Sequence, residues 1–290
     1  MSKHPADKVA ELWSPGSVSA ELRAPTIGEP LVLDGFRTDA TPLVHDRSAA
    51  EEELVEHRST LDDLHDRLMA ECRHSVLVIL QGLDGSGKSS TIKHVGRTLN
   101  PVGTSVASFK EPDAKEQAEP FLARIRRELP DPGHITFFDR SHYEDVIVPD
   151  ALDRMSDKDL TKRINDIVSF EEKLIRSGTV IVKCLLHISF DEQRERFLRR
   201  LRRPDKQWKL AESDLETRAD WARFQSAYGA AIGRTSTELS PWHIVPADHK
   251  WYRNWAIASL MCEQLAHLRS EYPPLEGDAE HFRAQLEPPN

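Results

Sequence analysis

The chain has 290 residues, of which 39% are hydrophobic and 30% charged, and its formal net charge is −9. This length allows one large core with at most a small accessory unit. The acidic balance argues against general nucleic-acid binding, and no apolar run approaches the ~20 residues of a membrane span. The N-terminus lacks the apolar core of a signal peptide, and the three cysteines are widely separated, which fits reduced thiols. We therefore expect a cytoplasmic protein that binds neither nucleic acid nor membrane.

Residues 1–45 carry five prolines and no periodic segment. They predict an extended N-terminal arm that packs on the domain or on a neighbour, with disorder as the alternative. From Asp46, an N-cap residue, leucines at helical spacing predict one long amphipathic helix to residue 73. Residues 46–270 are expected to form the main domain, and the polar, proline-containing residues 271–290 a C-terminal tail.

A glycine-rich motif follows the apolar strand expected at residues 75–81. Residues 82–89 read GLDGSGKS and match the phosphate-loop pattern G-x-x-x-x-G-K-[ST]. Gly82 and Gly87 permit backbone angles that let successive N–H groups converge on phosphate oxygens, and the helix expected near Ser89 adds its positive end. Lys88 supplies a mobile charge, and Ser89 a hydroxyl for Mg²⁺. A chance match is disfavoured because strand, loop and helix follow in the required order.

Strands and helices alternate along the rest of the chain. We expect strands at residues 104–109, 134–139, 179–188 and 241–246, and helices at residues 116–129, 157–177, 212–235 and 251–269, with another helix capped by Ser189. This order predicts an α/β fold, a P-loop kinase-like three-layer α/β/α arrangement with a parallel sheet of about five strands. Ligands should bind at the carboxyl ends of the strands, where the phosphate loop, Lys110 and Asp139 converge.

Asp139 ends the strand expected at residues 134–139. In nucleotide kinases, an acidic residue in this place holds Mg²⁺ directly or through water. A helix cap or a solvated strand end is the alternative, and it would be favoured for an isolated aspartate. With a phosphate loop in the same chain, the metal interpretation is preferred.

The segment from Arg194 to Lys209 is strongly basic, with eight cations against two acidic residues. A solvated helix face is the usual reason for such a run. Two features favour a mobile lid over residues 190–235 instead: the charges lie on several sides of the helix, and nucleotide kinases carry their lid at this place. Arginines that close over a phosphate chain exclude water and neutralise the charge of the transferred group.

The chain resembles the polyphosphate kinase family 2, P-loop phosphotransferases that move phosphate between inorganic polyphosphate and nucleotides. The resemblance extends from about residue 31 to residue 269. The matching segments are residues 82–89, 108–112 and 133–146, the lid motif from Arg196 through Pro204 to Asp214, and Pro241-Trp242 followed by Asp248 and Lys250.

The resemblance implies a set of site residues. The catalytic residues would be Asp84, Lys88, Asp139, Arg140 and Arg200. Polyphosphate would be bound by Gly85, Gly87, Lys88, Ser89, Ser90, Lys93, Arg200 and Arg203. The nucleotide would be bound by Phe109, Lys110, Arg140, Tyr143 and Glu144, with a base-binding surface around the two aromatic rings. Mg²⁺, or alternatively Mn²⁺, would be held by Asp84, Ser89 and Asp139.

The activity implied is Mg²⁺-dependent transfer of a terminal phosphate between polyphosphate and ADP, or AMP, with adenine or guanine as the base and a dimer or tetramer as the assembly. The order of residues 140–146 resembles the members that phosphorylate AMP as well as ADP, whereas Ala123 and residues 149–152 depart from the family pattern and leave the acceptor open. An ATP-dependent nucleoside monophosphate or small-metabolite kinase is the second hypothesis. A non-catalytic anion-binding protein ranks below both, since Asp84, Lys88 and Asp139 are all present.

Overall fold

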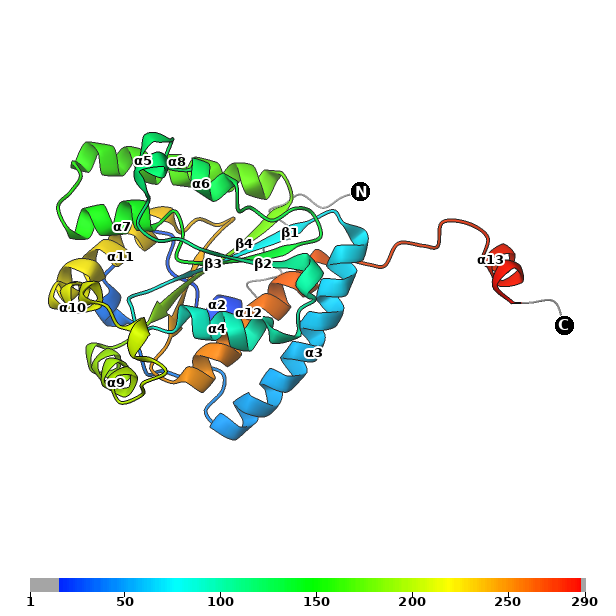
Figure 1. Cartoon of the computed structure of the whole chain (residues 1–290), viewed down its shortest axis with the longest axis horizontal. Helices are drawn as coiled ribbons and strands as arrows, with labels where there is room; N and C mark the ends of the chain where they lie inside the picture. The colour runs from blue at the N-terminus through cyan, green and yellow to red at the C-terminus, as the bar shows by residue number, and fades with distance from the viewer. Residues whose placement is uncertain (1–15, 288–290) are drawn as a thin grey trace.

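The computed structural model describes residues 16–287, so residues 1–15 of the expected arm and residues 288–290 of the expected tail lie outside the described residues. One parallel sheet with the order β2-β3-β1-β4-β5 forms the centre (Figure 1). Its strands are β1 (Ser75–Gln81), β2 (Thr104–Ser108), β3 (Ile135–Asp139), β4 (Thr179–His187) and β5 (Trp242–Pro246). The expected α/β fold with about five parallel strands is confirmed.

Helices cover both faces of this sheet (Figure 1). Their bounds are α2 (Val18–Glu21), α3 (Arg47–Glu71), α4 (Lys88–Val95), α5 (Ala114–Ala118), α6 (Ala123–Arg126), α7 (Glu144–Ala151), α8 (Asp157–Arg176), α9 (Phe190–Leu201), α10 (Glu212–Ala219), α11 (Trp221–Thr235), α12 (Lys250–Leu268) and α13 (Ala279–Leu286). Short 3-10 turns are η1 (Leu33–Gly35), η2 (Gly96–Thr98), η3 (Pro101–Gly103) and η4 (Gln207–Lys209).

The sheet separates two hydrophobic cores. One core joins the sheet to α3, α4 and α12, and the other joins it to α6, α7, α8 and α11. All seven residues of β1 are buried, as expected for a central strand with both faces covered. Leu61 and Leu68 of α3 are fully buried, and burying one leucine side chain contributes about 1.5–3 kcal/mol to stability. The three layers therefore fix the strand ends that carry the site.

Two helix starts lie where the sequence predicts them. The Asp46 carboxylate accepts hydrogen bonds from the backbone N–H groups of Ser48 and Ala49 at the start of α3. The Ser189 hydroxyl accepts one from Glu192 at the start of α9. Both bonds satisfy N–H groups that have no partner within the helix.

Two predicted helices are wrong because each is divided. Residues 116–129 form α5 and α6 instead of one helix. Pro120 forces the preceding Glu119 into an extended conformation (ψ 162°), which ends α5. Residues 212–235 form α10 and α11, separated at Asp220. Both breaks lie beside the cavity described below, so they shape its wall.

Other features were not predicted. Helix α7 begins directly after the loop that follows β3, and α13 lies in the expected tail, away from the body (Figure 1). The described part of the expected arm, from Gly16 to residue 45, packs on the domain, which is one of the predicted alternatives: Ala24 N donates to Trp242 O (2.7 Å) and Leu31 N to Gly229 O (3.0 Å). Within residues 16–287, no helix is long and apolar enough to cross a membrane. The division into arm, domain, lid and tail stays a prediction.

Candidate active site

The phosphate loop connects β1 to α4, which begins at Lys88. Gly82 and Gly87 have positive φ angles of 140° and 107°, a region that favours glycine. A Cβ atom on Gly82 would lie 2.7 Å from the carbonyl oxygen of Leu186, and one on Gly87 would collide with the Arg253 guanidinium. Both glycines are therefore required by space as well as by backbone angle.

Two buried arginines hold this loop from behind. Arg196 Nη1 donates to the carbonyl oxygens of Gly85 (2.9 Å) and Ser86 (2.8 Å), and Arg253 Nη1 also donates to Ser86 O (2.8 Å). Arg196 is only 6% exposed, so this member of the basic segment supports the phosphate loop and does not belong to a mobile surface. Arg253 was missed, because a lone arginine in an apolar helix gives no sequence signal.

Lys88, Ser89 and Asp139 meet at the mouth of the loop. Lys88 Nζ donates to Gly82 O (2.6 Å) and lies 3.9 Å from Asp84 Oδ1. The Ser89 hydroxyl donates to Asp139 Oδ2 (2.5 Å), so two oxygen ligands of the kind Mg²⁺ prefers are adjacent. No group of three or more His, Cys, Asp or Glu gathers as a metal site within residues 16–287. Mg²⁺ does not need one, because it commonly takes one or two carboxylates plus phosphates and water.

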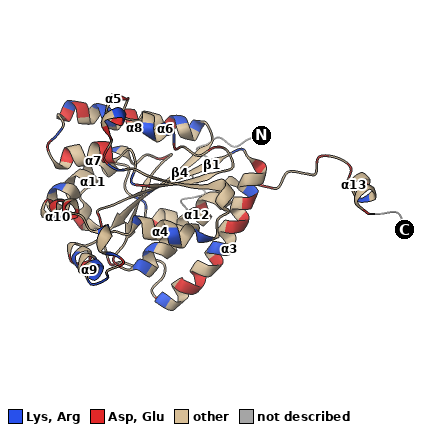
Figure 2. Cartoon of the chain, in the orientation of Figure 1, with Lys and Arg blue, Asp and Glu red and all other residues tan. Residues whose placement is uncertain are grey.

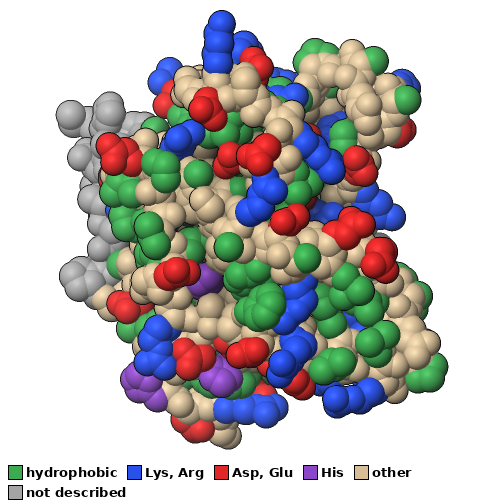
Figure 3. All heavy atoms as spheres, turned by 90° about the vertical axis from the view of Figure 1, so that its left-hand side faces the viewer, with side chains coloured by type: hydrophobic (Ala, Val, Ile, Leu, Met, Phe, Trp, Pro, Cys, Tyr) green, Lys and Arg blue, Asp and Glu red, His purple; other side chains and the backbone are tan. Residues whose placement is uncertain are grey.

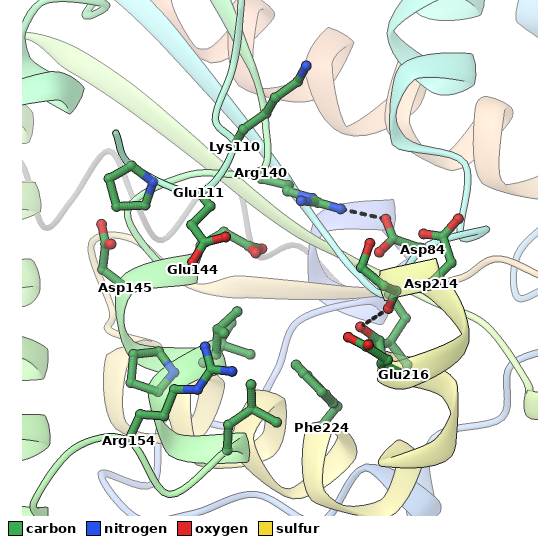
Figure 4. Close-up of a pocket in the computed structure, with 18 of the residues that line it drawn as sticks. Asp84, Lys110, Glu111, Arg140, Glu144, Asp145, Arg154, Asp214, Glu216 and Phe224 are labelled. Carbon is green, nitrogen blue, oxygen red and sulfur yellow. Dashed lines mark hydrogen bonds and ion pairs between the residues drawn. The ribbon is translucent and has the colours of Figure 1, made fainter. Parts of the chain in front are cut away.

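Arg140 and Asp84 form an ion pair across the same mouth. Arg140 Nη2 donates to Asp84 Oδ1 (2.6 Å), and the Arg140 backbone has a φ of 66° (Figure 4). Burial alone would raise the pKa of Asp84, but Lys88 and Arg140 outweigh it and hold that pKa below its usual value. Burial likewise opposes the charge on Arg140, yet Asp84 and Glu144 raise the pKa of its guanidinium. Both groups stay ionised, in a fixed relative position.

A cavity of about 1220 Å³ opens beside this pair (Figure 4). Lys110, Arg140 and Glu144 line one side, and Val148, Leu152 and Phe224 are among the apolar residues of its wall. Burial raises the pKa of Glu144, while Arg140 and Lys88 oppose that shift. On the outer face around α9, α10 and α11, basic and acidic side chains are interleaved (Figure 3).

The prediction of a base-binding surface at Phe109 and Tyr143 is wrong, because both rings are buried. Phe109 is 7% exposed and packs edge-on against Phe138 (ring centroids 4.8 Å apart). Tyr143 is fully buried and packs edge-on against Trp242 (4.7 Å). Neither ring is free to stack on a base, because both belong to the core beneath the cavity. The sequence does not distinguish an aromatic ring beside a site from one under it.

A buried charge network, missed from sequence, anchors the segment that carries Arg140. Glu171 accepts hydrogen bonds from Tyr143 Oη (2.7 Å) and Lys183 Nζ (2.6 Å), and its carboxylate lies 3.2 Å from His142 Nε2. Burial alone would raise the pKa of Glu171, but Lys183 and His142 lower it to about 2. The network thus fixes both residues that follow Ser141, next to Arg140 and Glu144.

The lid residues are divided between the site and the surface. Arg200 lies 3.8 Å from Asp214, whose pKa is raised first by burial and then by the neighbouring Asp84 carboxylate. Arg203 is 63% exposed and pairs with Asp205 (3.0 Å), so it lies outside this group in the structure. Ser90 and Lys93 are exposed on α4.

The protein-family model described as Polyphosphate kinase 2 (PPK2) matches residues 44–273. The chain belongs to the polyphosphate kinase 2 family. It is an enzyme of that type, as the resemblance implied. It is 43% identical over 234 residues to the AMP/ADP-polyphosphate phosphotransferase of Meiothermus ruber, which covers 81% of this chain and 88% of that protein.

Two further relatives agree in name and in fold. The ADP-polyphosphate phosphotransferase of Rhodopseudomonas palustris is 38% identical over 258 residues, which is 85% of this chain and 89% of that protein. The crystal structure of Polyphosphate Kinase 2 from Arthrobacter aurescens TC1 superposes with a TM-score of 0.90 at 34% identity, covering 93% of this chain and 96% of that one.

Proposed function

We propose that the protein transfers the terminal phosphate, with Mg²⁺, between inorganic polyphosphate and ADP or AMP. The names of the Meiothermus and Rhodopseudomonas relatives support these substrates. The observation that carries the proposal is the meeting of the Lys88 ammonium, the Ser89–Asp139 pair and the Arg140–Asp84 pair at one loop mouth, beside a cavity of about 1220 Å³. Adenine is the proposed base, with guanine as the alternative.

Ser89 and Asp139 would hold the metal, with Asp84 as the third candidate ligand. Mg²⁺, or Mn²⁺ in its place, would neutralise charge on the phosphates. The 2.5 Å contact between the Ser89 hydroxyl and the Asp139 carboxylate supports this assignment, because it brings together two oxygen ligands of the kind that Mg²⁺ prefers.

The donor would lie in the phosphate loop. Backbone N–H groups at Gly85 and Gly87 and the Lys88 ammonium would bind its terminal phosphates, and Ser90, Lys93 and Arg200 the next ones. An acceptor phosphate oxygen attacks the terminal phosphorus in line, the bond to the bridging oxygen breaks, and the shortened polyphosphate leaves. Arg140, held by Asp84, would stabilise the charge on the transferred group.

The nucleotide would occupy the cavity, with its phosphates toward Arg140 and Lys110. Because Phe109 and Tyr143 are buried, we assign the base to the apolar part of the wall at Val148, Leu152 and Phe224. Glu144 lies between these regions and would orient the acceptor. Arg203 would contact polyphosphate only if the lid closed further over the donor.

Incubation of the purified protein with ADP, Mg²⁺ and long-chain polyphosphate should yield ATP, and the same mixture with AMP should yield ADP. No product with any nucleotide would refute the proposal. Phosphorylation by ATP with no response to polyphosphate would select the ATP-dependent kinase, and tight polyphosphate binding without transfer would select the non-catalytic protein.

A homo-oligomer, as dimer or tetramer, and a cytoplasmic location are also part of this proposal. The assembly is supported by the family resemblance alone. Light scattering on the purified chain measures it directly, and a monomeric mass at micromolar concentration would contradict it.

A further inference from the structure

The described part of the N-terminal arm contacts the domain close to the start of α9. The Thr38 hydroxyl donates to Asp248 Oδ2 (2.8 Å), and Asp248 N donates back to Thr38 O (3.1 Å). Two reciprocal hydrogen bonds therefore join the arm to the turn between β5 and α12. The family model begins at residue 44, so Thr38 lies outside the region that it matches.

The Asp248 carboxylate also joins the arm to α9. Its second oxygen, Oδ1, accepts a hydrogen bond from the backbone N–H of Ser189 (2.8 Å), the N-cap residue of that helix. One oxygen of the carboxylate is thus bound to the arm and the other to the start of α9. Hydrogen bonds to a charged acceptor are stronger than those between neutral groups, so this one side chain fixes both segments.

Arg196 connects the same turn to the phosphate loop. Figure 2 shows basic residues along α9, and among them Arg196 is buried. Its Nη2 donates to the carbonyl oxygens of Ala247 (2.5 Å) and Asp248 (2.9 Å). Its Nη1 donates to the carbonyl oxygens of Gly85 (2.9 Å) and Ser86 (2.8 Å). Because the guanidinium is a rigid plane, a shift of the turn is passed on to the loop.

The direction of one loop N–H group depends on this contact. In a trans peptide, the N–H points away from the carbonyl group of the preceding residue. Arg196 and Arg253 both hold Ser86 O, so the N–H of Gly87 is directed away from the two arginines. Backbone N–H groups of such a loop bind phosphate oxygens when they converge on them.

We propose that Thr38 is a positioning residue for phosphoryl transfer. Through Asp248 and Arg196 it keeps the Gly87 N–H directed at the donor phosphates. The arm thereby contributes to catalysis without touching a substrate. This inference rests on the proposed function and extends it to a segment that precedes the matched family region.

The first test replaces the Thr38 hydroxyl by a methyl group. With ADP, Mg²⁺ and long-chain polyphosphate, kcat of Thr38→Val should fall about tenfold, as expected when one hydrogen bond to a charged group is lost. Both KM values should change less than about twofold, because a misdirected N–H weakens binding of the transition state more than binding of the substrates. Thr38→Ser keeps the hydroxyl and should retain kcat within about twofold of the wild type. In an Asp248→Ala background, Thr38→Val should change kcat less than about twofold, and a full tenfold effect there would contradict the route through Asp248.

Thr104→Val is the matched control. The Thr104 hydroxyl is also partly buried and donates to Asn100 O (2.9 Å), at the end of β2 that lies away from the phosphate loop. This variant should lose some thermal stability and keep the wild-type kcat. An equal loss of kcat in both variants, or an unchanged kcat in Thr38→Val, would show that the arm only stabilises the fold and would overturn the inference.

Hydrogen exchange measures the same contact without turnover. In substrate-free Thr38→Val, the amides of residues 85–89 and 189–193 should exchange about tenfold faster than in the wild type, whereas those of β1 should not change. Equal exchange in both proteins would overturn the inference even if activity fell. Absence of turnover by the wild-type protein with every donor would instead refute the proposed function, and the exchange rates would still decide whether the arm holds the loop.

Discussion

The cavity side of the phosphate loop and the opposite side, at α4, η2 and the start of α12, use charge differently. At the cavity, two of the lining arginines have carboxylate partners: Arg140 lies 2.6 Å from Asp84, and Arg124 lies 3.2 Å from Asp145. On the opposite side, Lys250 and Arg97 form no ion pair with a carboxylate among the described residues. A paired cation is held in one position and can orient a small acceptor, whereas an unpaired row is suited to a flexible polyanion.

The largest expected effect lies at the loop where the two sides meet. Lys88→Ala or Asp139→Asn should reduce turnover by roughly 10³-fold or more, because charge stabilisation of the transferred phosphate is the main catalytic contribution. Steady-state rates with ADP and polyphosphate measure this effect. Circular dichroism should show an unchanged fold, and loss of the fold would mean that these residues are structural.

The next prediction tests whether the buried charge network of Glu171 and Lys183 positions Arg140. Glu171→Leu leaves the buried Lys183 ammonium without its carboxylate partner, so the free energy of unfolding in urea should fall by about 3–5 kcal/mol. The double variant Glu171→Leu/Lys183→Met should recover most of this loss. If the recovered protein also keeps the wild-type kcat, the network does not position Arg140.

The same network predicts a pH dependence. The pKa of Glu171 is lowered from 4.5 to about 2 on folding. A lowered carboxylate pKa gives stability that is complete above about pH 4.5 and is lost as the pH falls toward 2. Thermal melts over this range should show that loss in the wild-type protein and a smaller one in the double variant. Equal slopes for both proteins would contradict the assignment.

A smaller effect is expected at the lid. Arg200→Ala should raise the KM for polyphosphate about tenfold, because one charged contact with the donor is lost, while the affinity for ADP changes less than about twofold. Kinetics with polyphosphate and calorimetry with ADP separate the two quantities. Comparable effects on both substrates would place Arg200 in the cavity rather than over the donor.

Local patterns predicted much of this structure, because each of them depends only on residues that are close together in the sequence. The glycines of the loop, the apolar strand before it and the Asp46 cap are examples. The Arg196 and Arg253 contacts with the loop, in contrast, join residues more than one hundred positions apart. The burial of Tyr143 depends on Glu171 and Lys183, which come from a helix and a strand that the sequence does not pair. Pro120 did carry a signal for the break after α5.

Two separate places for the two substrates are tested most directly by binding without turnover. ADP can be titrated calorimetrically into the Asp139→Asn variant, with and without saturating long-chain polyphosphate. Because we propose that the nucleotide binds in the cavity and the donor in the phosphate loop, the Kd for ADP should change less than about threefold. A Kd that rises in proportion to the polyphosphate concentration would show that both substrates compete for one place, and would contradict the division between cavity and phosphate loop.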